Sequence, residues 1–111
     1  MSKRVEMMTI ELSPEVRPVL NSIAGKTLDQ KIAHLLRSEI RHHLEACERE
    51  RLELEIKYGL EYVDFERKLE AGELGDEFGY ALEMDTLRWG DLIAEKKHWL
   101  QQLNLLKELI R

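Results

Sequence analysis

The sequence predicts a mainly α-helical protein: a short strand and two helices, followed by a helical C-terminal segment that contains a glycine-rich extended stretch. Three observations predict this class. Apolar residues recur at three- and four-residue spacing over most of the chain, as in amphipathic helices. A two-residue alternation is confined to two short stretches. With 43% hydrophobic and 35% charged residues, the chain is too apolar to be disordered throughout.

The first alternation covers residues 7–12, where Ile10 and Leu12 lie on the inward face of a predicted strand. Ser13 and Pro14 then predict a helix start, because serine is a good N-cap and proline suits the first helical position. The helix that follows should be short, and a glycine turn should end it.

The second predicted helix is long and covers residues 28–57. Thr27 is its expected N-cap and Gly59 its C-terminal stop. Apolar residues share one side of this helix as far as Cys47, and charged residues dominate beyond it. We therefore expect the second half of the helix to project from the core as a charged stalk.

A second segment begins near residue 58. Tyr62, Phe65 and Leu69 predict a short amphipathic helix that a glycine closes. Residues 78–84 show the second alternation and predict a strand-like stretch, after which Asp85 should cap a final helix that runs to about residue 110. The predicted division is thus residues 1–57 and residues 58–111.

Charge differs between the first part of the chain, up to residue 47, and the remainder. Residues 1–47 carry seven basic and six acidic side chains, whereas residues 48–111 carry ten basic and sixteen acidic ones. The acidic segment should repel nucleic acid and favour a basic partner surface. A single cysteine excludes a disulfide framework, and no apolar run approaches the length of a membrane span, so the cytoplasm is the expected compartment and no membrane partner is expected.

The segment TIELSPEVRPVLNSIAGKTLDQKIAHLLRSEI carries a strand, a Ser-Pro-Glu helix start and a Gly-Lys-Thr turn into an amphipathic helix. In these features it resembles a MetJ/Arc-type ribbon-helix-helix domain, over roughly residues 5–47. The resemblance implies a homodimer in which two strands pair, since a lone strand leaves both of its edges unpaired.

The same resemblance implies that the outward side of the ribbon enters the major groove of operator DNA and that basic and helix-start residues contact phosphate. The implied DNA-binding residues are Lys3, Arg4, Met7, Thr9, Glu11, Lys26 and Thr27. The ribbon departs from the family pattern, because Met7 and Glu11 are not typical readers of base edges. Two interpretations stay open: a ribbon that binds DNA, or one that serves only dimerisation.

A ribbon-helix-helix domain with an appended acidic segment resembles the antitoxins of prokaryotic toxin–antitoxin pairs. That resemblance implies that the second segment binds and neutralises a small, basic toxin. The candidate contact residues are aromatic, because aromatic side chains dominate interface energetics. They are Tyr62, Phe65, Phe78, Tyr80, Trp89 and Trp99. The alternative is a self-contained helical core. It is most favoured for Trp89 and Trp99, because these two residues lie on a continuous apolar stripe of the predicted final helix.

The sequence gives little sign of an enzyme or a cofactor. Two Glu-x-x-His pairs, which begin at Glu39 and Glu95, have the spacing of di-iron carboxylate bundles, but two pairs are no clear excess over chance. Glu39 and His43, one turn apart within the apolar arc of the long helix, are expected to pair either with each other or across a dimer. The leading hypothesis is therefore a non-enzymatic, antitoxin-like homodimer that autoregulates its operon. The alternatives are a ribbon-helix-helix regulator without a toxin and a helical interaction protein without DNA binding.

Overall fold

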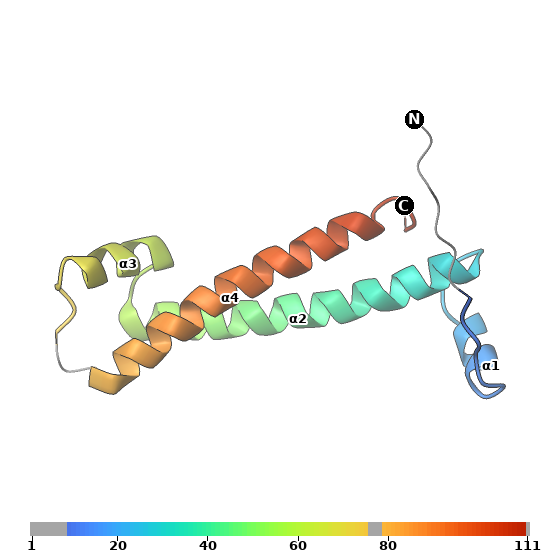
Figure 1. The fold of residues 1–111 in the computed structure, drawn as a ribbon, viewed down its shortest axis with the longest axis horizontal. Helices are drawn as coiled ribbons and strands as arrows, with labels where there is room; N and C mark the ends of the chain where they lie inside the picture. The colour runs from blue at the N-terminus through green and yellow to red at the C-terminus, as the bar shows by residue number, and fades with distance from the viewer. Residues whose placement is uncertain (1–8, 76–78, 111) are drawn as a thin grey trace.

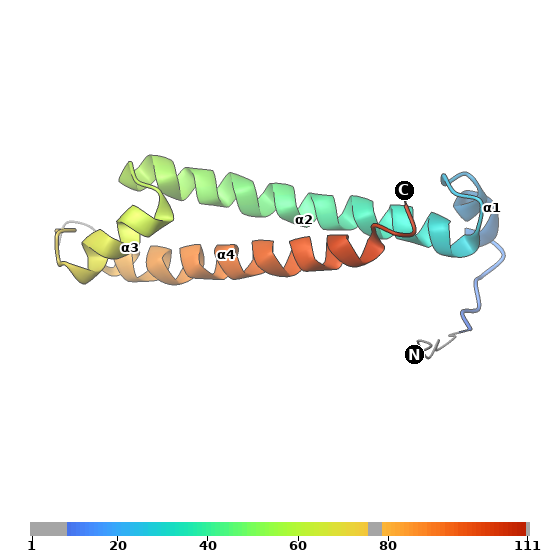
Figure 2. The same cartoon turned by 90° about the horizontal axis from the view of Figure 1, so that it is seen from above.

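The computed structural model describes residues 9–75 and 79–110, and these residues form four helices. They are α1 (Val16–Asn21), α2 (Leu28–Tyr58), α3 (Tyr62–Glu70) and α4 (Gly79–Leu106). The two long helices, α2 and α4, run antiparallel along each other, with α3 at one end and α1 at the other (Figure 1). The view from above shows the same hairpin as an elongated body (Figure 2), with extents of 58 × 40 × 23 Å.

The predicted ribbon-helix-helix architecture is wrong, because no described residue belongs to a strand. Residues 9–12 have no regular structure, and the rest of the predicted strand, with Met7, lies outside the described residues. Ile10 is about half exposed. A strand needs a neighbouring strand to bind its backbone N–H and C=O groups, and the described part of this chain offers none.

The second strand prediction is also wrong, since residues 79–84 form the first turns of α4 and Phe78 lies outside the described residues. Tyr80, Met84 and Leu87 follow one another at helical spacing, so the alternation was only part of a longer helical pattern. Asp85, predicted as the N-cap, lies inside α4 and accepts hydrogen bonds from Lys57 and Tyr58, each at 2.6 Å.

The connection between α1 and α2 is set by local capping. The α1 helix begins at Val16, two residues after the predicted start, and its N-cap is Glu15 rather than Ser13. The predicted cap of α2 is confirmed, because Thr27 Oγ1 accepts a hydrogen bond from the Gln30 amide at 3.1 Å. Gly25 makes the turn with a φ of 132°, a conformation that side-chain-bearing residues rarely adopt.

The predicted C-terminal stop of α2 is confirmed as well. Gly59 adopts the left-handed conformation, and its amide donates to the Glu55 carbonyl at 2.7 Å. The buried residues of α2 recur every seven positions, which is the repeat of a helix packed lengthwise against another helix. They are Ala33, Ile40, Cys47 and Leu54. The second half of α2 is therefore not a projecting stalk, because it packs against α4.

The core lies where α3 meets the two long helices. Trp89 and Leu92 of α4 and Phe65 of α3 are fully buried, and Cys47 and Leu54 of α2 join them. The Trp89 ring lies 4.7 Å from that of Phe65, centroid to centroid. This core combines side chains from both sides of the sequence division predicted near residue 58.

Candidate partner-binding site

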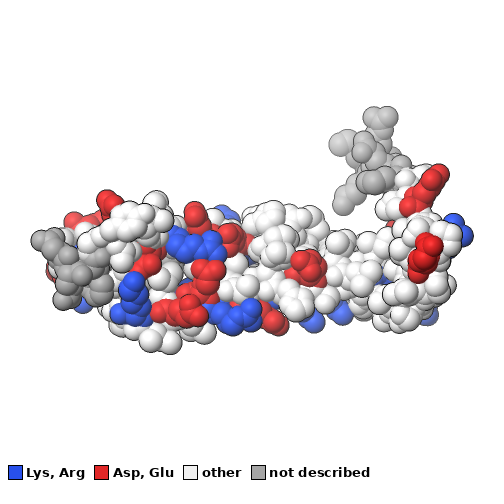
Figure 3. Space-filling view, turned by 90° about the horizontal axis from the view of Figure 1, so that it is seen from below, with Lys and Arg blue, Asp and Glu red and all other residues white. Residues whose placement is uncertain are grey.

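Negative charge is concentrated at the end of the hairpin that carries α3. Among the described residues, 61–75 and 79–87 carry seven acidic and two basic side chains, whereas 9–60 and 88–110 carry twelve of each sign. The net charge of −5 thus comes from this one region. On the face that Figure 3 shows, acidic and basic side chains gather toward the same end, and much of the surface toward α1 is uncharged. The α3 end is therefore a surface suited to a positively charged partner.

A groove of about 430 Å³ lies between α3 and the first turns of α4. Its lining is mainly apolar and consists of Leu69, Leu82, Glu83, Met84, Thr86 and Leu87. Leu87 is 66% exposed and Met84 is 47% exposed, and Tyr80, one turn before Met84, is 74% exposed. Exposed apolar side chains beside a groove are a common feature of protein-binding surfaces.

One carboxylate, Glu83, lines this groove, and Glu70 follows its Leu69 directly in the sequence. Glu70, Glu73 and Glu83 are exposed, and none of the three makes an ion pair with another described residue. Asp64 and Asp85, in contrast, pair with Arg67 and Lys57 at 2.8 and 2.6 Å. The unpaired carboxylates keep their full charge available to lysine or arginine side chains of another molecule.

The structure distributes the predicted aromatic contact residues over very different environments. Phe65 and Trp89 are fully buried in the chain's own core, so neither presents a surface to a partner. Tyr62 is half-buried with its ring 5.5 Å from Trp89, and Trp99 is half-buried in the α2–α4 contact. Tyr80 is exposed, and Phe78 lies outside the described residues. Helical spacing placed these rings on one side of a helix but could not tell which side another helix covers.

Sequence reasoning missed the apolar lining of the groove. Tyr80, Met84 and Leu87 are spaced at i, i+4 and i+7, so they form an apolar stripe once the helix is known to begin at Gly79. Because the prediction started the final helix at Asp85, this stripe was divided between a strand and a helix and was not recognised.

The structure describes four of the seven implied DNA-binding residues, Thr9, Glu11, Lys26 and Thr27. Thr9 and Glu11 lie in the irregular segment before α1, and the three remaining N-terminal candidates, Lys3, Arg4 and Met7, are outside the described residues. The Thr27 side chain caps α2, and the Lys26 amide donates to Gln30 Oε1 at 2.7 Å. The Lys26 amide and the Thr27 hydroxyl are thus engaged within the chain, and phosphate binding by these two residues stays a prediction.

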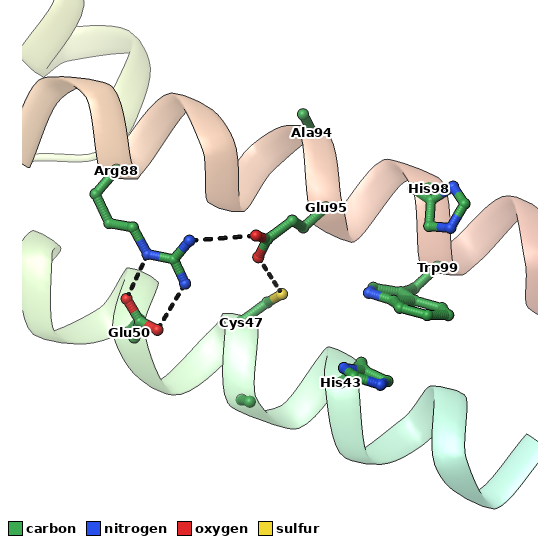
Figure 4. Close-up of a pocket in the computed structure, with 9 residues that line it drawn as sticks. His43, Cys47, Glu50, Arg88, Ala94, Glu95, His98 and Trp99 are labelled. Carbon is green, nitrogen blue, oxygen red and sulfur yellow. Dashed lines mark hydrogen bonds and ion pairs between the residues drawn. The ribbon is translucent and has the colours of Figure 1, made fainter.

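A polar cluster joins α2 to α4 beside a cavity of about 580 Å³ (Figure 4). Arg88 binds Glu50 through two hydrogen bonds of 2.7 and 2.8 Å and reaches Glu95 at 3.2 Å. The other Glu95 oxygen accepts from the Cys47 thiol at 3.4 Å. These bonds hold the pKa of Glu50 below its ordinary value and raise that of the Arg88 guanidinium.

At the other end of the cavity, the His43 ring lies flat on Trp99 with centroids 4.3 Å apart. His43 Nε2 is 3.1 Å from a Glu39 carboxylate oxygen, which confirms the predicted pairing. Burial, together with the hydrogen bond to Glu95, raises the pKa of the Cys47 thiol. A protonated thiol is a poor nucleophile and metal ligand. The hydrogen bonds of Arg88 to Glu50 and of Cys47 to Glu95 join α2 to α4.

Comparison of the chain with protein-family models, curated proteins and solved structures found no match. Within the described residues, no three His, Cys, Asp or Glu side chains are arranged to hold a metal ion. The same residues include no helix with the length and hydropathy of a membrane span. The groove and its charges are the described features that bear most directly on function.

Acid should weaken the α2–α4 contact. Hydrogen bonds from Arg51 and Lys96 lower the pKa of Glu48 to about 2, so folding stabilises the carboxylate form of Glu48. This contribution is present above the unfolded pKa of about 4.3 and is lost as pH falls toward 2. We expect the urea midpoint to fall between about pH 5 and pH 2, and to fall less in a Glu48→Gln variant. An equal fall in both proteins would show that Glu48 does not contribute to the loss of stability in acid.

Proposed function

We propose that the protein is a binding module that holds a small, basic protein at the α3 end of its helical hairpin. The observation that carries the proposal is the apolar groove between α3 and α4, which is lined by the exposed carboxylate of Glu83 and lies in the acidic part of the chain. An apolar side chain of the partner fills the groove beside Met84 and Leu87. Lysine and arginine side chains around it bind Glu70, Glu73 and Glu83.

The two kinds of contact contribute differently. Exposed ion pairs are worth about 0.2–1 kcal/mol each, and their main effect is to speed association at low salt. A desolvated apolar anchor in a groove is worth about 2 kcal/mol or more and slows dissociation. The carboxylates thus select a basic partner, and the groove retains it.

Binding of this kind supports an antitoxin-like role, in which the acidic end covers the basic working surface of a small toxin. The proposed site of action is the cytoplasm. Operator binding through a ribbon is not part of the proposal, because residues 9–12 form no strand. The proposal therefore concerns neutralisation of a partner protein.

The test is to purify the tagged protein from its source cells after nuclease treatment. Mass spectrometry then identifies the proteins that copurify with it. Wild type is compared with Met84→Asp in the groove and with Leu100→Asp, which is as exposed as Met84 on the same helix but lies outside the groove. We expect a small basic protein to be retained by wild type and Leu100→Asp and lost, at least tenfold, from Met84→Asp. Equal retention by all three proteins, or the absence of a basic partner, contradicts the proposal.

A further inference from the structure

The chain exposes far more surface than a compact protein of its mass. Its radius of gyration is 20.5 Å, against about 13 Å for a compact domain of this length. Its exposed area is 9132 Å². Of this area, the twelve residues outside the described part account for at most about 2,000 Å², the area they would expose in an unfolded chain. A compact protein made of the other residues would expose about 5,900 Å².

An excess of about 1,200 Å² therefore remains on the described part of the chain. A standard protein–protein interface removes about 800 Å² from each partner. The excess is thus large enough for one further interface on this hairpin.

Part of the excess is an apolar stripe at the beginning of α2. Leu28, Leu35 and Leu36 are each nearly half exposed, and Ile32 is partly buried. They are spaced at i, i+4, i+7 and i+8, which places them along one side of the helix. This side lies next to the buried row that contains Ala33, so the stripe is separate from the α2–α4 contact.

The charges of the hairpin leave this end free for a self-complementary contact. The α2–α4 ion pairs Glu48–Lys96, Glu50–Arg88 and Lys57–Asp85 all lie in the half nearer α3. In a symmetric dimer the same surface patch of both copies is in contact. A contact at the acidic α3 end would therefore bring like charges together. The stripe contains no ionisable side chain.

We propose that the stripe Leu28–Ile32–Leu35–Leu36 packs against the same stripe of a second copy, so that two hairpins form a four-helix bundle at the α1 end. The excess area is larger than the area of about 800 Å² that such a contact removes from each copy, and the uncharged stripe allows identical surfaces to meet. The acidic α3 ends then remain exposed on the dimer. This inference concerns another surface than the partner-binding groove, and either can fail alone.

The test is the mass of the full chain in solution, measured by light scattering over a dilution series. We expect twice the chain mass of 13.1 kDa for wild type and for the control Leu52→Glu/Ile56→Glu, which changes exposed apolar residues near the other end of α2. Leu35→Glu/Leu36→Glu should be monomeric, with a dissociation constant at least about 100-fold higher. A monomeric wild type, or a dimer that survives the stripe change, overturns the proposal.

A second experiment covers the case in which the double glutamate variant does not fold. Leu35→Cys and Leu52→Cys each add one exposed thiol to a chain whose own Cys47 is buried. Mild oxidation should join two copies of Leu35→Cys and leave Leu52→Cys and wild type as single chains on a denaturing gel. Equal cross-linking of the two variants overturns the stripe as the interface.

Discussion

Replacing Trp89 with alanine should lower the free energy of unfolding by about 3–5 kcal/mol, the largest single-residue effect we expect in this chain. The Trp89 side chain is fully buried, and its ring packs against those of Phe65 and Tyr62 at 4.7 and 5.5 Å. Its removal leaves a cavity where three helices meet. Since small domains have a total stability of about 5–15 kcal/mol, the variant should be close to unfolding at room temperature.

The measurement is urea denaturation followed by circular dichroism, with Tyr80→Ala as the exposed aromatic control. Trp89→Phe is a useful third variant, because Trp89 Nε1 has no hydrogen-bond partner among the described residues. Phenylalanine keeps most of the ring and loses no hydrogen bond, so its cost should be well below that of alanine. Similar urea midpoints for Trp89→Ala and Tyr80→Ala would show that the core is not centred on this ring.

Replacing Gly25 with alanine should lower the free energy of unfolding by about 1–3 kcal/mol, and its effect should be local. A Cβ atom at this position would lie 2.9 Å from the Lys31 amide nitrogen and from Gln30 Cβ, and the φ of 132° is itself strained for alanine. Lys31 Nζ donates to the Ile23 carbonyl at 2.6 Å. Moving the turn should break this bond and release α1 from α2.

Hydrogen exchange tests this prediction, because it measures the protection of each backbone amide separately. Amides of α1 and of the first turn of α2 should exchange faster in Gly25→Ala, while those near Trp89 keep their protection. Gly75→Ala is the matched control, because nothing lies within 4 Å of its added Cβ and its φ is not positive. If both variants exchange alike, the turn does not hold α1 in place.

The helix boundaries that local chemistry determines were predictable from the sequence. Thr27 and Gly59 act through hydrogen bonds to residues three or four positions away, so their roles can be recognised without the rest of the fold. The start of α4 was not predictable in this way. Four alternating residues fit both a strand and a helix, and the choice depended on the helix that continues after them.

The strand before α1 was predicted wrongly for a different reason, which also explains why Phe65 and Trp89 were among the contact candidates. Spacing shows which side chains share a face, but only tertiary packing decides whether another helix covers that face. Phe65 and Trp89 proved to be core because α4 folds back on α2, a contact between segments distant in sequence. The acidic character of the second segment was readable from composition, and the structure adds the groove beside those charges.

The antiparallel course of α2 and α4 has a consequence for the order of folding. Tyr58 and Asp85, nearest α3, are 27 residues apart, whereas Cys47 and Glu95 are 48 apart and His43 and Trp99 are 56 apart. Closing a longer loop costs more chain entropy, by about 0.6 kcal/mol for each doubling of its length. The hairpin therefore closes from the α3 end toward the α1 end. A chain emerging from the ribosome can therefore complete the α3 end, with its groove, once the first turns of α4 have been made, whereas the contact at the α1 end must wait for the rest of α4.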